Sequence, residues 1–330
     1  MKNKKDDVST FDSKSHKKPH PNPKPQPQPS SSFYTLLTEP DQGTGAIYNL
    51  LSSAKTSIDM TMYELIDATV IELLSTAAAQ GVKVRVILDQ NEEKERNTTA
   101  FNALNENRVS VHWANPSFSC THQKTITIDS ATSVIMTLNL TAQDYPTSRD
   151  FAVITNNVND IAAIQATFNA DFIDASITPP TGDNLVWSPT NSRSSLLALI
   201  NGAQKSLLIS QEEFEDSNIE NAILAALGRN VSVTLVQENV QDKFTKTLNA
   251  LKNTGAQIAV YSSQTGYYIH AKAILADYGT SAAKLFIGSE NFSTYSLDRN
   301  RELGLIFTDA ACMAGVQAAL TKDFNQGTKF

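Results

Sequence analysis

The sequence predicts an α/β fold built from two similar halves. Apolar runs with the alternation typical of strands, such as residues 82–88 (VKVRVIL), follow segments with helical periodicity. The same order of strands and helices then starts again about 148 residues later. A period of this length indicates a duplicated domain rather than a solenoid of short repeats. With 330 residues, 41% of them hydrophobic, the chain is long enough to bury a substantial core.

In the first half, residues 57–62 form a β-like run and residues 69–80 have a helical pattern that Gly81 closes. Strands are expected over 82–88, 109–113, 124–129, 133–137 and 151–155, with a helix over 160–172. This succession of strand, helix and strand is typical of βαβ units.

The second half repeats that order after the segment ITPPTGDN at residues 177–184. Strands are expected over 206–210, 231–236, 257–261, 271–276, 285–288 and 303–307. Helices are expected over 195–200, 219–227, 243–252 and 310–324, the last with Asp309 as its N-cap. The strand 231–236 (VSVTLV) corresponds to the strand 82–88, which shows the repeat most directly.

Three regions follow from this pattern. Residues 1–32 hold six of the twelve prolines and seven lysines, a composition typical of a disordered spacer, or of a docking peptide. The first half is assigned to residues 33–178 and the second to residues 179–330. The basic N-terminus is not followed by an apolar stretch, so no signal peptide is predicted. We expect a soluble protein that is extracytoplasmic or secreted.

Composition excludes several classes of protein. No apolar run approaches the ~18–20 residues of a membrane-spanning helix. Two cysteines, Cys120 and Cys312, are too few for a disulfide scaffold or a cysteine-based zinc site. Outside residues 1–32 the chain carries 20 basic and 31 acidic groups, a balance that argues against broad nucleic-acid binding.

The residues suited to chemistry occur twice in the same order, each time starting with an H-x-K-x4-D motif. Outside residues 1–32 the chain has one other histidine, His112, so both motifs use scarce residues. The first set comprises His122, Lys124, Asp129, Thr137, Asn139 and Asp150. The second set comprises His270, Lys272, Asp277, Ser289, Asn291 and Glu302.

The spacing of these residues predicts a phosphate site. Residues two apart on a strand share a face, so each histidine projects with its lysine, and Thr137 projects with Asn139. Imidazole, ammonium, hydroxyl and amide groups together suit an anionic oxygen cluster. Asp129 and Asp277 lie at odd spacing from the histidines, so we expect them to support the strand ends.

Two histidines can divide a phosphodiester displacement into two steps. A neutral imidazole attacks phosphorus and forms a phospho-histidine, while the second, protonated, histidine gives its proton to the leaving oxygen and then activates water. Lys124 and Lys272 would stabilise the phosphoryl charge, so neither a metal nor another cofactor is needed. Asp150 and Glu302 are candidates to orient the two imidazoles.

These duplicated motifs resemble those of the phospholipase D superfamily, and the resemblance extends from about residue 33 to the C-terminus. It implies two α/β/α sandwich halves related by a pseudo-twofold axis, with one active site at their interface. It also implies that His122 is the nucleophile and His270 the general acid, that Thr137, Ser289 and the two lysines and asparagines bind phosphate, and that Asp150 and Glu302 orient the histidines. The usual Gly-Ser before the first asparagine is replaced by Met136-Thr137, and Asp150 is shorter than Glu302.

The function expected from this resemblance is metal-independent hydrolysis of a phospholipid headgroup ester, with possible transfer of the phosphatidyl group to an alcohol. The partner is then a phospholipid at a membrane surface or in a micelle, with no stable nucleic-acid partner, and a monomer suffices because one chain carries both motifs. The alternatives are a nuclease acting on DNA or RNA, a soluble transferase similar to cardiolipin synthase, and a non-enzymatic binding module. Aromatic residues near the motifs, among them Trp113 and Tyr268, form either a lipid-facing rim or ordinary core.

Overall fold

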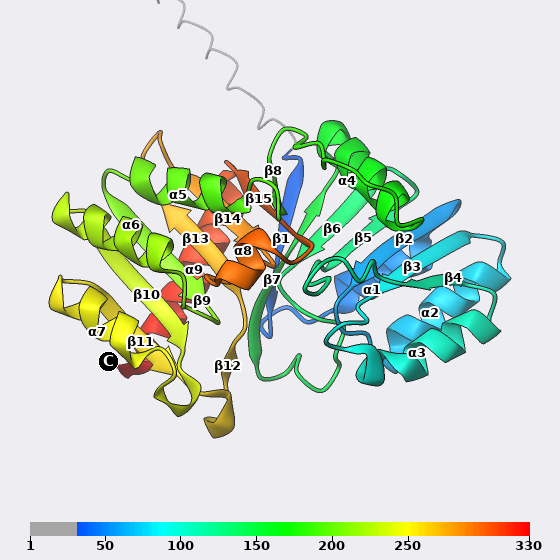
Figure 1. The fold of residues 1–330 in the computed structure, drawn as a ribbon, viewed down its shortest axis with the longest axis horizontal. Coiled ribbons are helices and arrows are strands. Elements are labelled where there is room, and N and C mark those ends of the chain that lie inside the picture. The colour runs from blue at the N-terminus through cyan, green and yellow to red at the C-terminus, as the bar shows by residue number, and fades with distance from the viewer. Residues whose placement is uncertain (1–31) are drawn as a thin grey trace, which may run out of the picture. The chain divides into compact units, whose positions relative to one another are not determined.

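Two mixed sheets form the framework of the chain, each with helices on its faces (Figure 1). They are seen in a computed structural model that describes residues 32–330, and Phe33–Phe330 make up one compact unit. The tail predicted for residues 1–32 lies outside the described residues, apart from Ser32. Among the residues described, no helix combines the length and the apolar character needed to cross a bilayer.

The elements up to residue 171 build the first sheet and its helices. The strands are β1 (Tyr34–Glu39), β2 (Ser57–Met62), β3 (Lys83–Leu88), β4 (Ser110–Trp113), β5 (Thr125–Ile128), β6 (Thr132–Met136) and β7 (Ser148–Thr155). The helices are α1 (Gly45–Ser53), α2 (Ala68–Ala79), α3 (Lys94–Glu106) and α4 (Val158–Asp171).

The elements from residue 185 onward, apart from the short strand Tyr268–Ile269, build the second sheet and its helices. The strands are β8 (Leu185–Ser188), β9 (Ser206–Gln211), β10 (Ser232–Glu238), β11 (Gln257–Tyr261), β12 (Tyr268–Ile269), β13 (Lys272–Ala276), β14 (Lys284–Gly288), β15 (Glu302–Phe307) and β16 (Thr328–Lys329). The helices are α5 (Ser192–Gly202), α6 (Ser217–Gly228), α7 (Thr245–Asn253), α8 (Thr294–Asp298) and α9 (Ala310–Gln326), with short 3₁₀ turns at Val240–Asp242 and Ser263–Thr265.

The two sheets have the same topology. The first runs β1-β7-β6-β5-β2-β3-β4, and the second runs β8-β15-β14-β13-β9-β10-β11 with β16 added at its edge. In both, the last three strands are parallel and the others antiparallel. The predicted duplication is therefore a duplication of a complete sheet. The exception is β12, which follows β11 in the chain but pairs with β7 of the first sheet.

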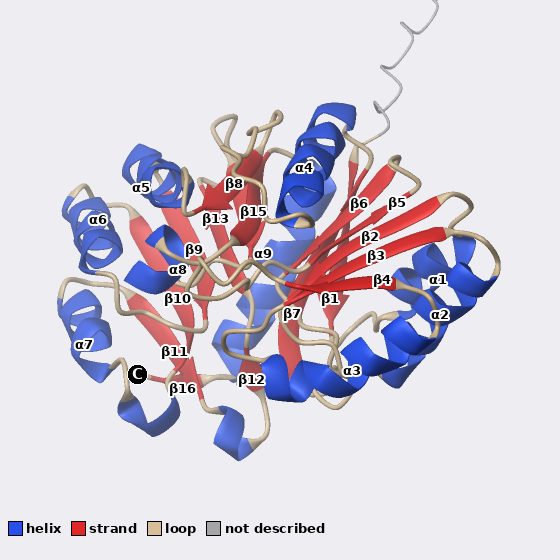
Figure 2. Cartoon of the chain, turned by 45° about the vertical axis from the view of Figure 1, so that its right-hand side comes forward, coloured by secondary structure: helices blue, strands red, loops and turns tan. Residues whose placement is uncertain are grey.

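Three large hydrophobic clusters hold these layers together. One lies between the first sheet and helices α1–α3, and its counterpart lies between the second sheet and helices α5–α7. The third is shared by both halves and includes Phe151 of β7, Trp187 of β8, Ile164 of α4 and Val316 of α9. Figure 2 shows α4 and α9 on the inner side of the two fans of strands. Since these side chains are almost fully buried, the shared cluster fixes the halves against each other.

Equivalent aspartates start equivalent helices after β2 and β9. Asp67 accepts hydrogen bonds from the backbone N–H groups of Thr69 and Val70 at the start of α2. Asp216 does the same at the start of α6. Such caps satisfy backbone donors that a helix leaves free at its N-terminus. They fix the course of the loops that leave β2 and β9, where part of the candidate site lies.

Several elements were not predicted by the sequence pattern, among them α1, α3, β1 and β8. Helix α3 (KERNTTAFNALNE) is too polar to show a clear apolar face. It is anchored by buried Asn97, which donates to the carbonyls of Tyr63 and Asp89 and accepts from the N–H of Leu65. Because these are tertiary contacts, local periodicity does not reveal them.

Candidate active site

Each histidine of the repeated motif lies against the other half of the chain. Strand β12 runs parallel to the start of β7, and the N–H groups of His270 and Ala271 donate to the carbonyl of Arg149 at 3.2 and 2.8 Å. In the same way, the N–H groups of His122 and Gln123 donate to the carbonyl of Arg301 at 2.9 and 3.0 Å. These crossed backbone contacts bring each histidine beside the acid that follows that arginine.

The acids pair with the histidines across the halves. His122 Nδ1 donates to Glu302 Oε2 at 2.9 Å, and His270 Nδ1 donates to Asp150 Oδ1 at 2.8 Å. A hydrogen bond of this kind fixes the orientation of the ring and, in a neutral imidazole, leaves the lone pair on the other nitrogen, Nε2. The structure thus brings together the two histidines and the two acids that the sequence predicted as their partners.

The charge state of the His122 pair follows from its burial. Burial and the nearby Lys124 ammonium lower the pKa of His122, so its imidazole is neutral near pH 7. Burial alone would raise the pKa of Glu302, but His122 and Lys124 together hold it below its usual range. A neutral imidazole oriented by an ionised carboxylate is suited to nucleophilic attack.

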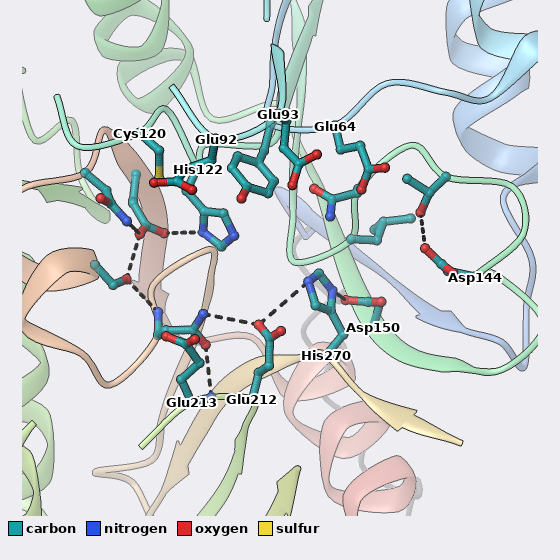
Figure 3. A pocket seen from close by; sticks show the side chains of 18 of the residues that line it. Glu64, Glu92, Glu93, Cys120, His122, Asp144, Asp150, Glu212, Glu213 and His270 are labelled. Carbon is teal, nitrogen blue, oxygen red and sulfur yellow. Dashed lines mark hydrogen bonds and ion pairs between the residues drawn. The ribbon is translucent and has the colours of Figure 1, made fainter. Parts of the chain in front are cut away.

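Both imidazoles line one cavity of about 480 Å³, and Figure 3 shows their rings facing each other across it. Asn139 and Asn291 also line this cavity, as the sequence predicted for phosphate-binding residues. Among the described residues, the charged lining consists of one arginine, Arg96, and nine carboxylates. The carboxylates are those of Glu39, Glu64, Glu92, Glu93, Asp144, Asp150, Glu212, Glu213 and Glu302.

The two lysines of the motifs are fully buried beside the histidines. Lys124 Nζ donates to the carbonyl of His122 at 2.7 Å and lies 4.9 Å from the centre of the Tyr63 ring. Burial and the positive charge of Lys272 lower the pKa of Lys124 to about 7. Lys272 Nζ lies 2.6 Å from Glu212 Oε2. The two half-sites therefore differ, since one ammonium has a carboxylate partner and the other has an aromatic ring.

The hydroxyls of Thr137 and Ser289 do not face the cavity, which corrects their expected place in the phosphate site. Thr137 Oγ1 donates to Asp150 Oδ1 at 2.5 Å and accepts from the N–H of Phe151. Ser289 Oγ accepts from the N–H of Leu303 at 3.2 Å. Both side chains are fully buried. They hold the strands that carry the acids, because Thr137 bonds to β7 and Ser289 bonds to β15.

Asp129 and Asp277 have matching places away from the cavity. Asp129 accepts from the backbone N–H groups of residues 55, 56 and 57, and Asp277 accepts from those of residues 204, 205 and 206. Both have a φ of +53°, which places them in the left-handed region at a strand end. Backbone donors lower the pKa of Asp129 to about 2, although burial acts in the opposite direction. The geometry is that of a support for β2 and β9.

The replacement of the motif glycine by Met136 is compensated by packing. In the second half, Gly288 lies opposite Gly304, where a Cβ on Gly288 would come within 2.5 Å of the Gly304 Cα and 2.3 Å of the Glu290 carboxyl. In the first half the equivalent pair is Met136 and Ala152. Leu138 replaces Glu290 there, so apolar atoms fill the space that a carboxyl group occupies in the second half.

Sequence reasoning missed the residue that follows β2 and β9 in each half, which is Tyr63 in the first and Glu212 in the second. Both line the cavity. The repeat itself contains the signal, because TMYELID and SQEEFED occupy equivalent places and end strands that neighbour the motif strands. Among the aromatic residues left open, Tyr268 lines the cavity, whereas Trp113 stacks on Phe101 with ring centres 4.3 Å apart.

Cys120, Cys312 and His112 take no part in the histidine–carboxylate pairs, although Cys120 also lines the cavity. Cys120 and Cys312 are both free and buried, so they do not form the single bridge that two cysteines would allow. His112 Nδ1 bonds to the carbonyl of Phe172 at 3.0 Å and its ring stacks on that residue. Across the described residues, no group of three or more histidine, cysteine, aspartate or glutamate side chains is arranged to hold a metal ion.

Comparison with known proteins gives matches along most of the chain. The family model described as "Cardiolipin synthase, PLD-like domain" matches residues 47–172 and 196–326. A protein of Rickettsia conorii named phospholipase D is 31% identical over 112 residues, which are 34% of this chain and 55% of that protein. The chain thus spans about half the length of this curated relative.

Two solved structures share the fold. Polyphosphate kinase of Porphyromonas gingivalis aligns with a TM-score of 0.71 and 16% identity, over 88% of this chain and 47% of the kinase. Phosphatidylserine synthase of Haemophilus influenzae aligns with a TM-score of 0.67 and 12% identity, over 90% of this chain and 87% of the synthase. The predicted α/β fold of two similar halves is confirmed by these alignments and by the equal topology of the two sheets.

Proposed function

Because the chain belongs to the family of PLD-like domains that includes cardiolipin synthase, we propose that it cleaves the headgroup phosphodiester of a glycerophospholipid, as a phospholipase D does. Members of this superfamily are phosphodiesterases and transferases. The observation that carries the proposal is the pair of crossed histidine–carboxylate contacts, at 2.9 and 2.8 Å, on one cavity. Two oriented imidazoles on one cavity suit an attack on phosphorus from one side and proton donation on the other.

The proposed reaction has two steps. In the first, the Nε2 lone pair of His122 attacks phosphorus, the bond from phosphorus to the headgroup oxygen breaks, and protonated His270 gives its Nε2 proton to that oxygen. In the second, water attacks phosphorus and gives a proton to His270, and the phosphorus–nitrogen bond breaks with its electron pair returning to His122. Phosphatidic acid and the free alcohol are the products, and both histidines return to their starting states.

The buried cations support the first step. Lys124 and Lys272 lie beside the histidines, and a fixed ammonium in a site shielded from water stabilises phosphoryl charge strongly. Asn139 and Asn291 line the cavity and can donate their amide N–H groups to phosphoryl oxygens. The lowered pKa of His122, caused by burial and by Lys124, keeps the proposed nucleophile unprotonated.

Transfer to an alcohol is the second candidate, and the description of the matching family favours it. An alcohol that replaces water in the second step yields a new phosphodiester with the same residues. A nuclease is disfavoured, since nine carboxyl groups and one arginine line the cavity. Burial raises the pKa of Glu39 and Glu64 to about 7, and the ionised carboxylates would repel a polyanion.

A paired substrate assay tests the proposal. Wild type and H122A are incubated in EDTA either with mixed phospholipid vesicles or with short single- and double-stranded DNA. We expect phosphatidic acid release by wild type and a loss of about 10³-fold or more in H122A, because no neighbouring group replaces a covalent nucleophile. Adding glycerol or ethanol to the vesicles separates transfer from hydrolysis by the product formed.

Other outcomes contradict the proposal. DNA cleavage without lipid turnover would identify a nuclease, and residual lipid turnover in H122A within tenfold of wild type would exclude His122 as nucleophile. Loss of activity in EDTA would indicate a metal requirement. H112A is the matched control, because His112 bonds to Phe172 away from the cavity, and its activity should equal that of wild type.

A further inference from the structure

The carboxylate of Glu212 occupies the groups that a phosphate would use in the second half-site. Its Oε2 lies 2.6 Å from Lys272 Nζ and accepts from Asn291 Nδ2 at 3.1 Å. The same oxygen lies 3.8 Å from His270 Nε2, and Figure 3 shows the carboxylate pointing toward that ring. The Tyr268 hydroxyl donates to the other oxygen, Oε1. Glu212 therefore contacts Lys272, Asn291 and His270, which are three of the site residues predicted for the second half.

The first half has no carboxylate at this place. The residue after β2, equivalent to Glu212 after β9, is Tyr63. Its ring lies against His122, with ring centres 4.6 Å apart, and beneath the Lys124 ammonium. A phosphoryl group can approach Lys124 over an uncharged ring, whereas it approaches Lys272 only by displacing a carboxylate. At this place the two half-sites differ by one side chain, which is Tyr63 in the first half and Glu212 in the second.

Charge compensation makes this difference important for the substrate. Three carboxylates (Asp150, Glu212 and Glu302) lie around the imidazoles with two lysines and, in the proposed reaction, protonated His270, so these charges balance. All of these groups are buried or partly buried. A phosphodiester adds one more negative charge, and an uncompensated charge in a buried site is costly. A positive charge carried by the substrate itself would restore the balance. Without Glu212, Asp150 and Glu302 would balance the two lysines, and the charge of protonated His270 would favour an anion whatever its headgroup.

The position of Glu212 also tells which part of the substrate would carry that charge. In the proposed reaction, which this inference rests on, His122 attacks and the alcohol leaves on the opposite side, toward His270. Glu212 lies on the His270 side. The leaving alcohol, which is the lipid headgroup, therefore passes the carboxylate, and so does an incoming alcohol in the second step.

We propose that Glu212 selects phosphodiesters whose leaving alcohol carries a positive charge, such as an ammonium headgroup. The phosphoryl oxygens take over the contacts with Lys272 and Asn291, and the displaced carboxylate pairs with the headgroup cation. The ring of Tyr268, which lines the cavity next to Glu212, offers the same cation an aromatic face. A neutral or anionic headgroup leaves the displaced carboxylate without a partner.

The test compares two headgroups on monomeric lipids, so that the charge of a vesicle surface has no influence. Dihexanoyl phosphatidylethanolamine and dihexanoyl phosphatidylglycerol are supplied below their micellar concentrations, and kcat/KM is measured from phosphatidic acid formation. We expect wild type to prefer the ethanolamine lipid by about tenfold or more. E212Q, which keeps the shape and removes the charge, should lower this preference by about tenfold, through weaker turnover of the ethanolamine lipid and faster turnover of the glycerol lipid.

Two further variants complete the design. E212Y introduces the side chain found at the equivalent place of the first half and should lower the preference as E212Q does. E215Q removes a carboxylate three residues away, whose side chain is 50% exposed and paired with Lys243 at 3.0 Å, and should leave the preference within twofold of wild type. Circular dichroism melting curves show that each variant is folded.

Each result has a definite meaning. Unchanged preference in folded E212Q, or an equal change for both lipids, overturns the inference while the proposed function stands. Preference of wild type for the glycerol lipid also overturns it, and this result does not depend on any variant being folded. Turnover of neither lipid by wild type refutes the proposed function and removes the basis of the inference with it.

Discussion

Replacing Glu302 by glutamine tests whether the crossed carboxylate sets the reactivity of His122. Glu302 Oε1 accepts from the Ser296 hydroxyl at 2.6 Å and from Asn300 Nδ2 at 2.9 Å, while Oε2 accepts from His122 Nδ1 at 2.9 Å. In E302Q, the two donors at Oε1 keep the amide oxygen there, so the amide N–H₂ group must face Nδ1. The imidazole can then accept at Nδ1 only if its proton moves to Nε2, the atom that would attack phosphorus.

The size of the effect follows from two contributions. A hydrogen bond to a charged group contributes about 1.5–3 kcal/mol, or roughly 10–150-fold in rate. The wrong tautomer adds to this, and in a serine-protease triad an aspartate-to-asparagine change that forces it lowers kcat about 10⁴-fold. We therefore expect kcat of E302Q to fall by about 10²–10⁴-fold. The loss should stay smaller than that of H270A, which removes the proton donor entirely.

The assay is headgroup release from a monomeric short-chain phospholipid, with acid-labile phosphoenzyme measured after rapid quenching. E302Q should slow the formation of phosphoenzyme, whereas D150N should slow both its formation and its hydrolysis, because Asp150 orients the histidine that donates a proton in the first step and activates water in the second. S296A, which removes one donor at Oε1, should lose less than tenfold. A kcat of folded E302Q within tenfold of wild type would refute the tautomer argument.

Three further predictions concern the buried lysine and the strand support. In the free enzyme, kcat/KM should fall as the pH rises through about 7, because Lys124 loses its proton there, and K124R should shift that decline to higher pH. K124M should melt at a higher temperature than wild type at pH 6, and the difference should shrink between pH 7 and the ordinary lysine pKa of 10.5, since the folded state releases its proton first. D129A should lower the free energy of unfolding by about 1–3 kcal/mol in denaturant titrations and leave kcat/KM within threefold.

The fold and much of the site were predictable because local pattern and the repeat supplied the same information twice. Alternation over residues 82–88 and 231–236 predicted β3 and β10. The H-x-K motifs predicted that His122 and His270 meet at one cavity, and their lysines are buried beside them. The helix expected over 69–80 is α2 (Ala68–Ala79), and Gly81 follows it with a φ of +91°. These features depend on neighbours in the sequence, so periodicity reveals them.

The parts that were missed depend on contacts distant in sequence. The hydroxyl of Thr137 shares a strand face with Asn139 by spacing, yet it bonds to Asp150 because β7 lies beside β6. The sequence does not show which acid orients which histidine. That depends on the pairing of β12 with β7 of the other sheet, a contact between segments distant in the sequence. Glu212 lies outside both motifs, and its role depends on its distance to Lys272.

Because each histidine pairs with a carboxylate of the other half, the proposed activity would also depend on the two halves being docked together. A cut between residues 178 and 179 would leave each fragment with its own sheet and its own H-x-K motif, but with the carboxylate that its histidine needs on the other fragment. Turnover by the mixed fragments would therefore rise with the product of their concentrations until docking saturates. The shared core of Phe151, Trp187 and Val316 would then set the affinity of the two fragments for each other.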